Sequence, residues 1–147
     1  MKKYKCHKIA KGIAEGELLF SEDPICFYLV DPESGKVIEN GHYLEGVSIA
    51  NKIIVFPGGK GSSVVQADGL YQLQLKNNAP KGMIIQYPDT VLVATSIIMS
   101  VPLVDQLEKS FYEDEANGTL VELNANNETI KIKWVDNWWG LIIWINK

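Results

Sequence analysis

The chain has 147 residues, a formal net charge of −4, and 46% hydrophobic against 22% charged residues. This composition is typical of a globular protein of about one domain, and it excludes a disordered tail, a collagen-like fibre and a coiled coil. The acidic balance argues against nucleic-acid binding, because neutralising phosphates requires a cationic surface. Two cysteines are too few for a disulfide scaffold or for the four thiolates of an ordinary iron–sulfur site, so we expect a reduced, cytoplasmic protein. No apolar run approaches the ~20 residues of a membrane-spanning helix, so we expect no membrane association.

The first third of the chain is predicted to be β-structure. Short apolar runs around Gly12 and Gly16 lead to a turn at residues 21–24. Residues 25–30, Ile-Cys-Phe-Tyr-Leu-Val, are predicted to form a strand, because aromatic and β-branched residues between turn formers favour one. The following Asp31-Pro32-Glu33-Ser34-Gly35 favours a tight reversal.

The middle third is predicted to alternate strands and helices. The apolar run at residues 52–56 is typical of a strand covered on both faces, and a helix is expected to begin at Ser62 or Ser63 and to end before Pro80. Further elements are a strand at residues 83–87, a helix at 90–99 and a short strand at 102–104. Because this order favours right-handed crossovers between parallel strands, we expect an α/β fold with a parallel strand–helix core.

The last third is predicted to be β-structure again. Residues 119–123 and 129–133 alternate apolar and polar side chains, with a hairpin loop at 124–128. All four tryptophans lie in the tail at residues 134–147. This tail is expected either to form a final strand on the same domain or to contact another chain. The whole chain, residues 1–147, is expected to be one domain.

The loop after the strand at residues 52–56 carries the chemistry that the sequence offers. It reads Pro57-Gly58-Gly59-Lys60-Gly61-Ser62-Ser63 and leads into the predicted helix. Ligands of open α/β sheets bind beyond the carboxyl ends of strands, and free N–H groups at a helix start attract anions. Neither a P-loop nor a dinucleotide fingerprint fits the spacing of these glycines. The residues alone therefore leave two alternatives open, an anion-binding loop or a turn in which Ser62 merely caps the helix.

The region from about residue 12 to residue 133 resembles the small subunit, or swivelling domain, of the aconitase X family. The resemblance depends on motifs between residues 30 and 105: Val30-Asp31-Pro32-Glu33-Ser34-Gly35-Lys36-Val37-Ile38, His42, Leu44-Glu45-Gly46, residues 55–64 with the glycine loop, Ala79-Pro80, and Val101-Pro102-Leu103-Val104-Asp105.

This resemblance implies a swivelling β/β/α domain with a β-barrel-like sheet portion. It also implies a hydro-lyase that dehydrates a small hydroxy acid, (R)-5-phosphomevalonate, to trans-anhydromevalonate 5-phosphate on an archaeal route to isoprenoids. A separate large subunit of the aconitase X type would hold a 4Fe-4S cluster, and this chain would bind none. Ser62 would be the proton acceptor, and Gly58, Gly59, Lys60, Gly61 and Ser63 would form the loop that binds the anionic substrate.

Two departures from the family pattern keep alternatives open. Tyr28-Leu29 stands where a Gly-Gly pair is usual, and Val65-Gln66-Ala67 replaces small residues after the serines. The alternatives are the small subunit of a cis-3-hydroxy-L-proline dehydratase and a non-catalytic swivelling domain that binds a ligand or partner. For Cys6, His7, Cys26 and His42, structural roles are expected rather than metal binding, with a strand–turn hydrogen bond for His42.

Overall fold

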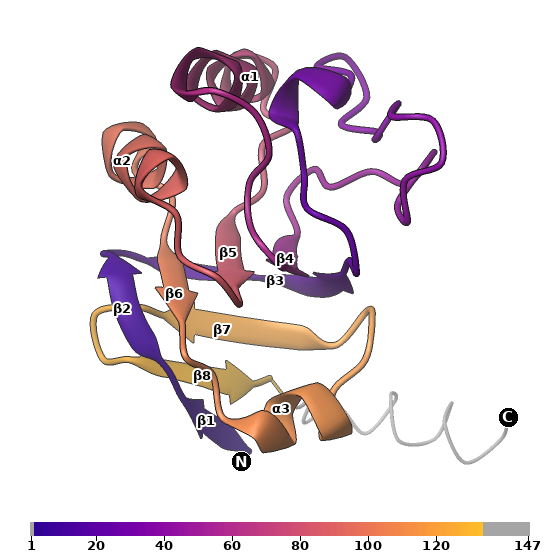
Figure 1. Ribbon diagram of the computed structural model, residues 1–147. Coiled ribbons are helices and arrows are strands. Elements are labelled where there is room, and N and C mark those ends of the chain that lie inside the picture. Colours follow the sequence, from indigo (N-terminus) through magenta and orange to yellow (C-terminus); the bar gives the residue numbers. More distant parts are fainter. Residues whose placement is uncertain (1, 134–147) are drawn as a thin grey trace, which may run out of the picture.

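The computed structural model describes residues 2–133, which are organised around one eight-stranded sheet (Figure 1). The strands lie in the order β1-β8-β7-β3-β4-β5-β6-β2. Their bounds are Lys3–Lys5 (β1), His7–Ala10 (β2), Ile13–Phe20 (β3), Ile53–Phe56 (β4), Gly82–Ile85 (β5), Leu103–Asp105 (β6), Leu120–Asn124 (β7) and Thr129–Ile132 (β8). The helices of these residues are α1 (Ser63–Leu75), α2 (Thr90–Met99), α3 (Lys109–Asp114) and the 3-10 helix η1 (Phe27–Leu29).

Strand β3 joins the two halves of the sheet. Its first residues pair with β7 in antiparallel register, from Ile13 opposite Asn124 to Glu17 opposite Leu120. Its last residues pair with β4 in parallel register, and β4, β5 and β6 continue in parallel. The predicted parallel core is therefore confirmed, as is the α/β class.

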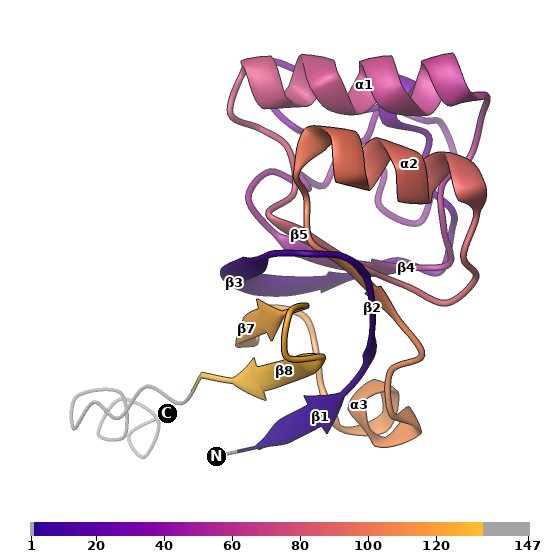
Figure 2. The same ribbon diagram turned by 90° about the vertical axis from the view of Figure 1, so that its left-hand side faces the viewer.

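The parallel strands are covered on both faces. Helices α1 and α2 lie side by side over one face, and β7, β8, β1 and α3 lie on the other (Figure 2). Along β4, Ile54 and Phe56 belong to the apolar cluster beneath the two helices, whereas Ile53 and Val55 belong to the cluster around Phe111. All four residues are buried, which explains why this strand is an unbroken apolar run.

The sheet does not close into a barrel, so the expected β-barrel-like portion is wrong in that respect. Strands β1 and β2 are the two edges, and only Cys6 separates them in the chain. They do not pair with each other, because β1 pairs with β8 in one half of the sheet and β2 pairs with β6 in the other.

Residues 25–30 do not form the predicted strand. Only Ile25 and Val30 make isolated bridges, and Phe27–Leu29 form η1. Helix α1 packs against this turn at Gly69, where an added Cβ would lie 2.7 Å from the carbonyl carbon of Phe27. Tertiary packing has overridden the strand propensity of these side chains.

The tail at residues 134–147 lies outside the described residues, so both expectations for it stay predictions.

Candidate functional site

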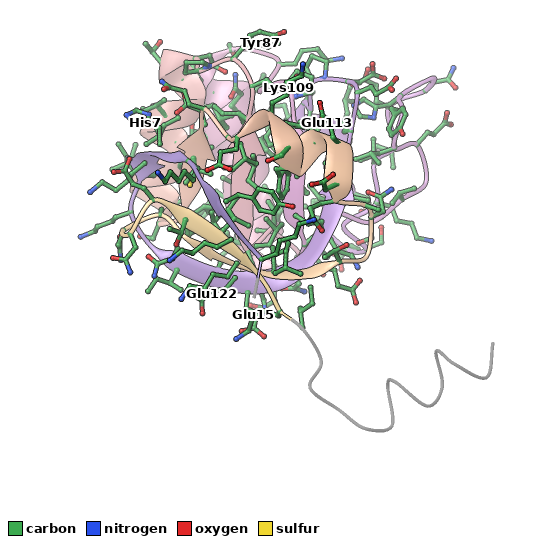
Figure 3. All side chains as sticks on the ribbon, turned by 90° about the horizontal axis from the view of Figure 1, so that it is seen from below. His7, Glu15, Tyr87, Lys109, Glu113 and Glu122 are labelled. Carbon is green, nitrogen blue, oxygen red and sulfur yellow. The ribbon has the colours of Figure 1, made fainter. Side chains whose placement is uncertain are left out.

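Hydrogen bonds to two neighbouring segments hold the glycine loop between β4 and α1. On one side, Ile25 N–H donates to Gly58 O at 3.1 Å and Lys60 N–H donates to Ile25 O at 3.0 Å. On the other side, Tyr87 N–H donates to Pro57 O at 3.0 Å, while the Tyr87 side chain projects to the periphery of the molecule (Figure 3). The loop is thus a fixed feature at the carboxyl end of the parallel strands, where ligands of such sheets bind.

Ser62 is the N-cap of α1 and is exposed to solvent. Its backbone is extended, with φ −70° and ψ 171°, and its Oγ accepts a hydrogen bond of 3.4 Å from Val65 N–H. The hydroxyl therefore points neither into the core nor into another polar network of the described residues. It caps the helix and remains accessible to a ligand, which is compatible with both alternatives drawn from the sequence.

Several backbone donors around Ser62 are free. The N–H groups of Gly61, Ser62, Ser63 and Val64 have no hydrogen-bond partner within residues 2–133. Gly61 has φ +109°, a conformation that favours glycine, and an added Cβ there would lie 2.8 Å from Val65 Cγ1. Free donors combined with the positive end of the helix dipole favour a negative charge at this position.

Lys60 is bound in an ion pair. Its Nζ lies 2.7 Å from Glu39 Oε2, and the two side chains are 47% and 22% exposed. The second carboxylate oxygen, Glu39 Oε1, is buried and has no hydrogen-bond partner among the described residues. Sequence reasoning missed Glu39, because the two residues are 21 positions apart and no local pattern connects them.

A pocket of about 330 Å³ lies beside the start of the loop. It is lined by Phe20, Ser21, Glu22, Tyr43, Val55, Phe56, Gln86 and Tyr112. Burial raises the pKa of Tyr112, with the charge of Asp105 as a second cause. None of the predicted site residues, Gly58 to Ser63, lines this pocket, so the structure brings the loop residues together with one another but not with this cavity.

Comparison with known proteins assigns the chain to a family. The family model described as "Aconitase X swivel domain" matches residues 3–132. The chain belongs to the aconitase X swivel domain family. Among its curated relatives, the phosphomevalonate dehydratase small subunit of Methanosarcina acetivorans is 43% identical over 131 residues, which is 88% of this chain and 90% of that one. The protein of the same name from Thermococcus kodakarensis is 38% identical over 88% of this chain and 96% of its own length.

Solved structures agree with this assignment. The crystal structure of Thermococcus kodakaraensis aconitase X in its holo-form matches with a TM-score of 0.80 and 37% identity, covering 91% of this chain and all of that chain. A structure determined by NMR in solution matches with a TM-score of 0.78 and 34% identity, covering 90% of this chain. The fold of this family member is therefore that of the aconitase X swivel domain.

The 4Fe-4S cluster that the resemblance places in a large subunit stays a prediction, and both cysteines of this chain are free thiols. Cys6 is buried in the core, and burial raises the pKa of its thiol to about 12. Cys26 lies under the glycine loop, where its Sγ would be 3.9 Å from a Cβ added at Gly61. Residues 2–133 contain no group of three His, Cys, Asp or Glu side chains able to hold a metal ion.

His42 has the structural role that the sequence suggested. Leu44 N–H donates to His42 Nδ1 at 2.9 Å, so the ring proton lies on Nε2 and donates to Pro24 O at 2.8 Å. The predicted hydrogen-bonding role is confirmed, and it holds the 42–46 turn against the segment that precedes η1.

Among residues 2–133, every helix is too short or too polar to span a bilayer.

Proposed function

We propose that this chain is the small subunit of a phosphomevalonate dehydratase, which removes water from (R)-5-phosphomevalonate to give trans-anhydromevalonate 5-phosphate. The observation that carries the proposal is the 43% identity, over 88% of the chain, to a relative of that name. The glycine loop adds chemical support, because its free N–H groups and exposed Ser62 suit an anionic substrate.

The relatives are named small subunits, which implies a larger partner subunit. The proposed partner is a large subunit of the aconitase X type that holds the 4Fe-4S cluster, and the chain is proposed to be active only in that complex. Exposure of Ser62 at the surface supports this arrangement, since a reaction that needs a dry site requires a second chain to cover it. When bound there, the cluster would supply a Lewis acid.

In the proposed reaction, Ser62 Oγ, as an alkoxide, takes the proton from the carbon next to the substrate carboxylate. The electron pair of the broken C–H bond forms the double bond, and hydroxide leaves from the neighbouring carbon. That hydroxide takes the proton back from Ser62, so that one water is released and the alkoxide is restored. The Val65 N–H and the helix dipole stabilise negative charge on this oxygen.

The test is to express this chain with the large subunit encoded by the same organism and to assay the purified complex. Dehydration of (R)-5-phosphomevalonate, with no turnover of cis-3-hydroxy-L-proline, is the expected result. Turnover of the hydroxyproline alone would move the assignment to the other dehydratase, and a complex inactive on both would favour a binding domain.

A further inference from the structure

Gln66 lies beneath the glycine loop and is 2% exposed. Its Nε2 donates to Gly61 O at 3.0 Å, and its backbone N–H donates to Ser62 O at 3.0 Å. Its side-chain amide also packs on Gly59, where an added Cβ would lie 2.3 Å from Gln66 Oε1. The buried side chain of Gln66 therefore contacts Gly59 and Gly61, and its backbone N–H binds Ser62.

The orientation of the Gln66 amide follows from these contacts. If nitrogen and oxygen were exchanged, two carbonyl oxygens would face each other at Gly61, which is unfavourable. Gln66 Oε1 is left buried and without a hydrogen-bond partner in the described residues. A buried polar group that lacks a partner is costly, so its presence at this loop points to a role beyond stability.

The bond to Gly61 O also orients the next peptide N–H. In a trans peptide, the carbonyl of one residue and the N–H of the next point in opposite directions. Because Gln66 holds the Gly61 carbonyl inward, the Ser62 N–H must point outward, and it has no partner within residues 2–133.

We propose that Gln66 is a positioning residue, which fixes the Gly61–Ser62 peptide so that the Ser62 N–H and Oγ face the substrate together. The inference rests on the proposed function and adds to it a residue outside the Pro57–Ser63 loop motif. Loss of the anchor lets the peptide rotate, and displacement of a reacting group by about 1 Å can cost about 100-fold in rate.

The test uses Gln66→Met and Gln66→Glu in the two-subunit complex. Gln66→Met has similar length but no donor, and is expected to lower kcat by about 10- to 100-fold at every pH, with a smaller change in KM. Gln66→Glu can donate to Gly61 O only when its carboxyl group is protonated. Burial raises the pKa of that carboxyl group above the usual value of about 4.3, so activity approaches that of the wild type at acid pH and falls as pH rises.

The matched control is Gln74→Glu on the same helix. Gln74 Nε2 donates to Met99 O at 2.8 Å, which is an equivalent bond to a backbone carbonyl away from the loop. This variant is expected to lose some stability while keeping the wild-type kcat and pH profile. Wild-type kcat in Gln66→Met, or a Gln66→Glu profile parallel to that of the wild type, overturns the proposal. If Gln66→Glu does not fold, Gln66→Met decides the question.

A second measurement needs no substrate. In the ¹⁵N-labelled full chain, the Ser62 amide resonance of Gln66→Glu is expected to shift with pH together with the new carboxyl group, whereas the wild-type resonance shows no such titration. Absence of that titration refutes the positioning role of Gln66. A wild-type complex that does not dehydrate 5-phosphomevalonate refutes the proposed function instead, and the amide titration still tests Gln66.

Discussion

The charge at the glycine loop depends on two residues far apart in the chain. Lys60 is the cation of the loop, but Glu39 lies 2.7 Å from its ammonium group and cancels much of its field. An anionic substrate bound at the proposed site would therefore meet a nearly neutral pair. Because Glu39 is only 22% exposed and its Oε1 is buried without a partner among the described residues, an anion that displaces this carboxylate from Lys60 leaves a poorly solvated charge behind, which opposes binding.

Neutralising Lys60 and neutralising Glu39 are expected to have opposite effects on KM. Lys60→Gln removes the cation and should raise KM for 5-phosphomevalonate by about 10-fold, since hydrogen bonds to charged groups contribute about 1.5–3 kcal/mol. Glu39→Gln frees the cation and should lower KM by about 2- to 5-fold. Steady-state kinetics of the complex measures both, with the exposed Lys36→Gln as control. Equal increases in KM for both variants would contradict this account.

At the scale of elements, the position of Ser62 depends on how α1 packs against η1. The two meet at Gly69, where a Cβ would lie 2.7–2.8 Å from backbone and side-chain atoms of Phe27 and from Tyr28 N. Tyr28 OH donates to Asp68 Oδ2 at 2.8 Å and closes the same contact from the surface. Tyr28, which stands where the family usually has glycine, thus connects η1 to α1, the helix that Ser62 caps.

Gly69→Ala is expected to destabilise the protein by about 1–3 kcal/mol, although alanine normally favours a helix by about 1 kcal/mol over glycine. The added methyl group meets backbone atoms that cannot move independently of η1. Chemical denaturation measures the free energy of unfolding, and Gln72→Ala on the exposed face of α1 should change it by less than about 0.5 kcal/mol. A stabilised Gly69→Ala protein would show that the two elements can separate freely.

The sequence predicted those helices and strands that have strong local signals. The buried strand β4, the start of α1 after Ser62 and the helix at residues 90–99 follow from apolar runs, caps and prolines, and they lie where expected. The strand predicted at residues 25–30 is wrong because their apolar side chains suit a strand as well as a buried turn. Only the packing of α1 against them selects the turn. The pair of Glu39 with Lys60 and the anchor at Gln66 could not be predicted, because both depend on how distant segments meet.

At the scale of the whole molecule, two apolar clusters lie on opposite faces of the parallel strands. Cys6 belongs to the cluster around Phe111 and lies at the junction of β1 and β2, where the chain passes from one half of the sheet to the other. Burial, followed by the charges of Glu128 and Asp105, raises the pKa of its thiol from 9.0 to about 12. The neutral thiol is thus favoured in the folded state.

This shift predicts how stability depends on pH. A raised folded-state pKa contributes stability that is present in full below about pH 9 and is lost as pH rises toward 12. Between pH 9 and 10.5 the loss due to Cys6 should be about 1–2 kcal/mol. Denaturation of the wild type and of Cys6→Val at both pH values isolates this contribution, since the valine variant lacks the titrating group. Parallel losses in the two proteins would contradict it.

The most direct test of the account is the turnover of the reconstituted complex that carries Ser62→Ala. We expect kcat for 5-phosphomevalonate to fall by at least about 10²–10⁴-fold, because a positioned acid–base group typically contributes that much, while the two subunits still assemble. Ser110→Ala, a hydroxyl loss on α3, serves as the control and should keep wild-type turnover. A Ser62→Ala complex that dehydrates the substrate at the wild-type rate would contradict the assignment of Ser62 as the base.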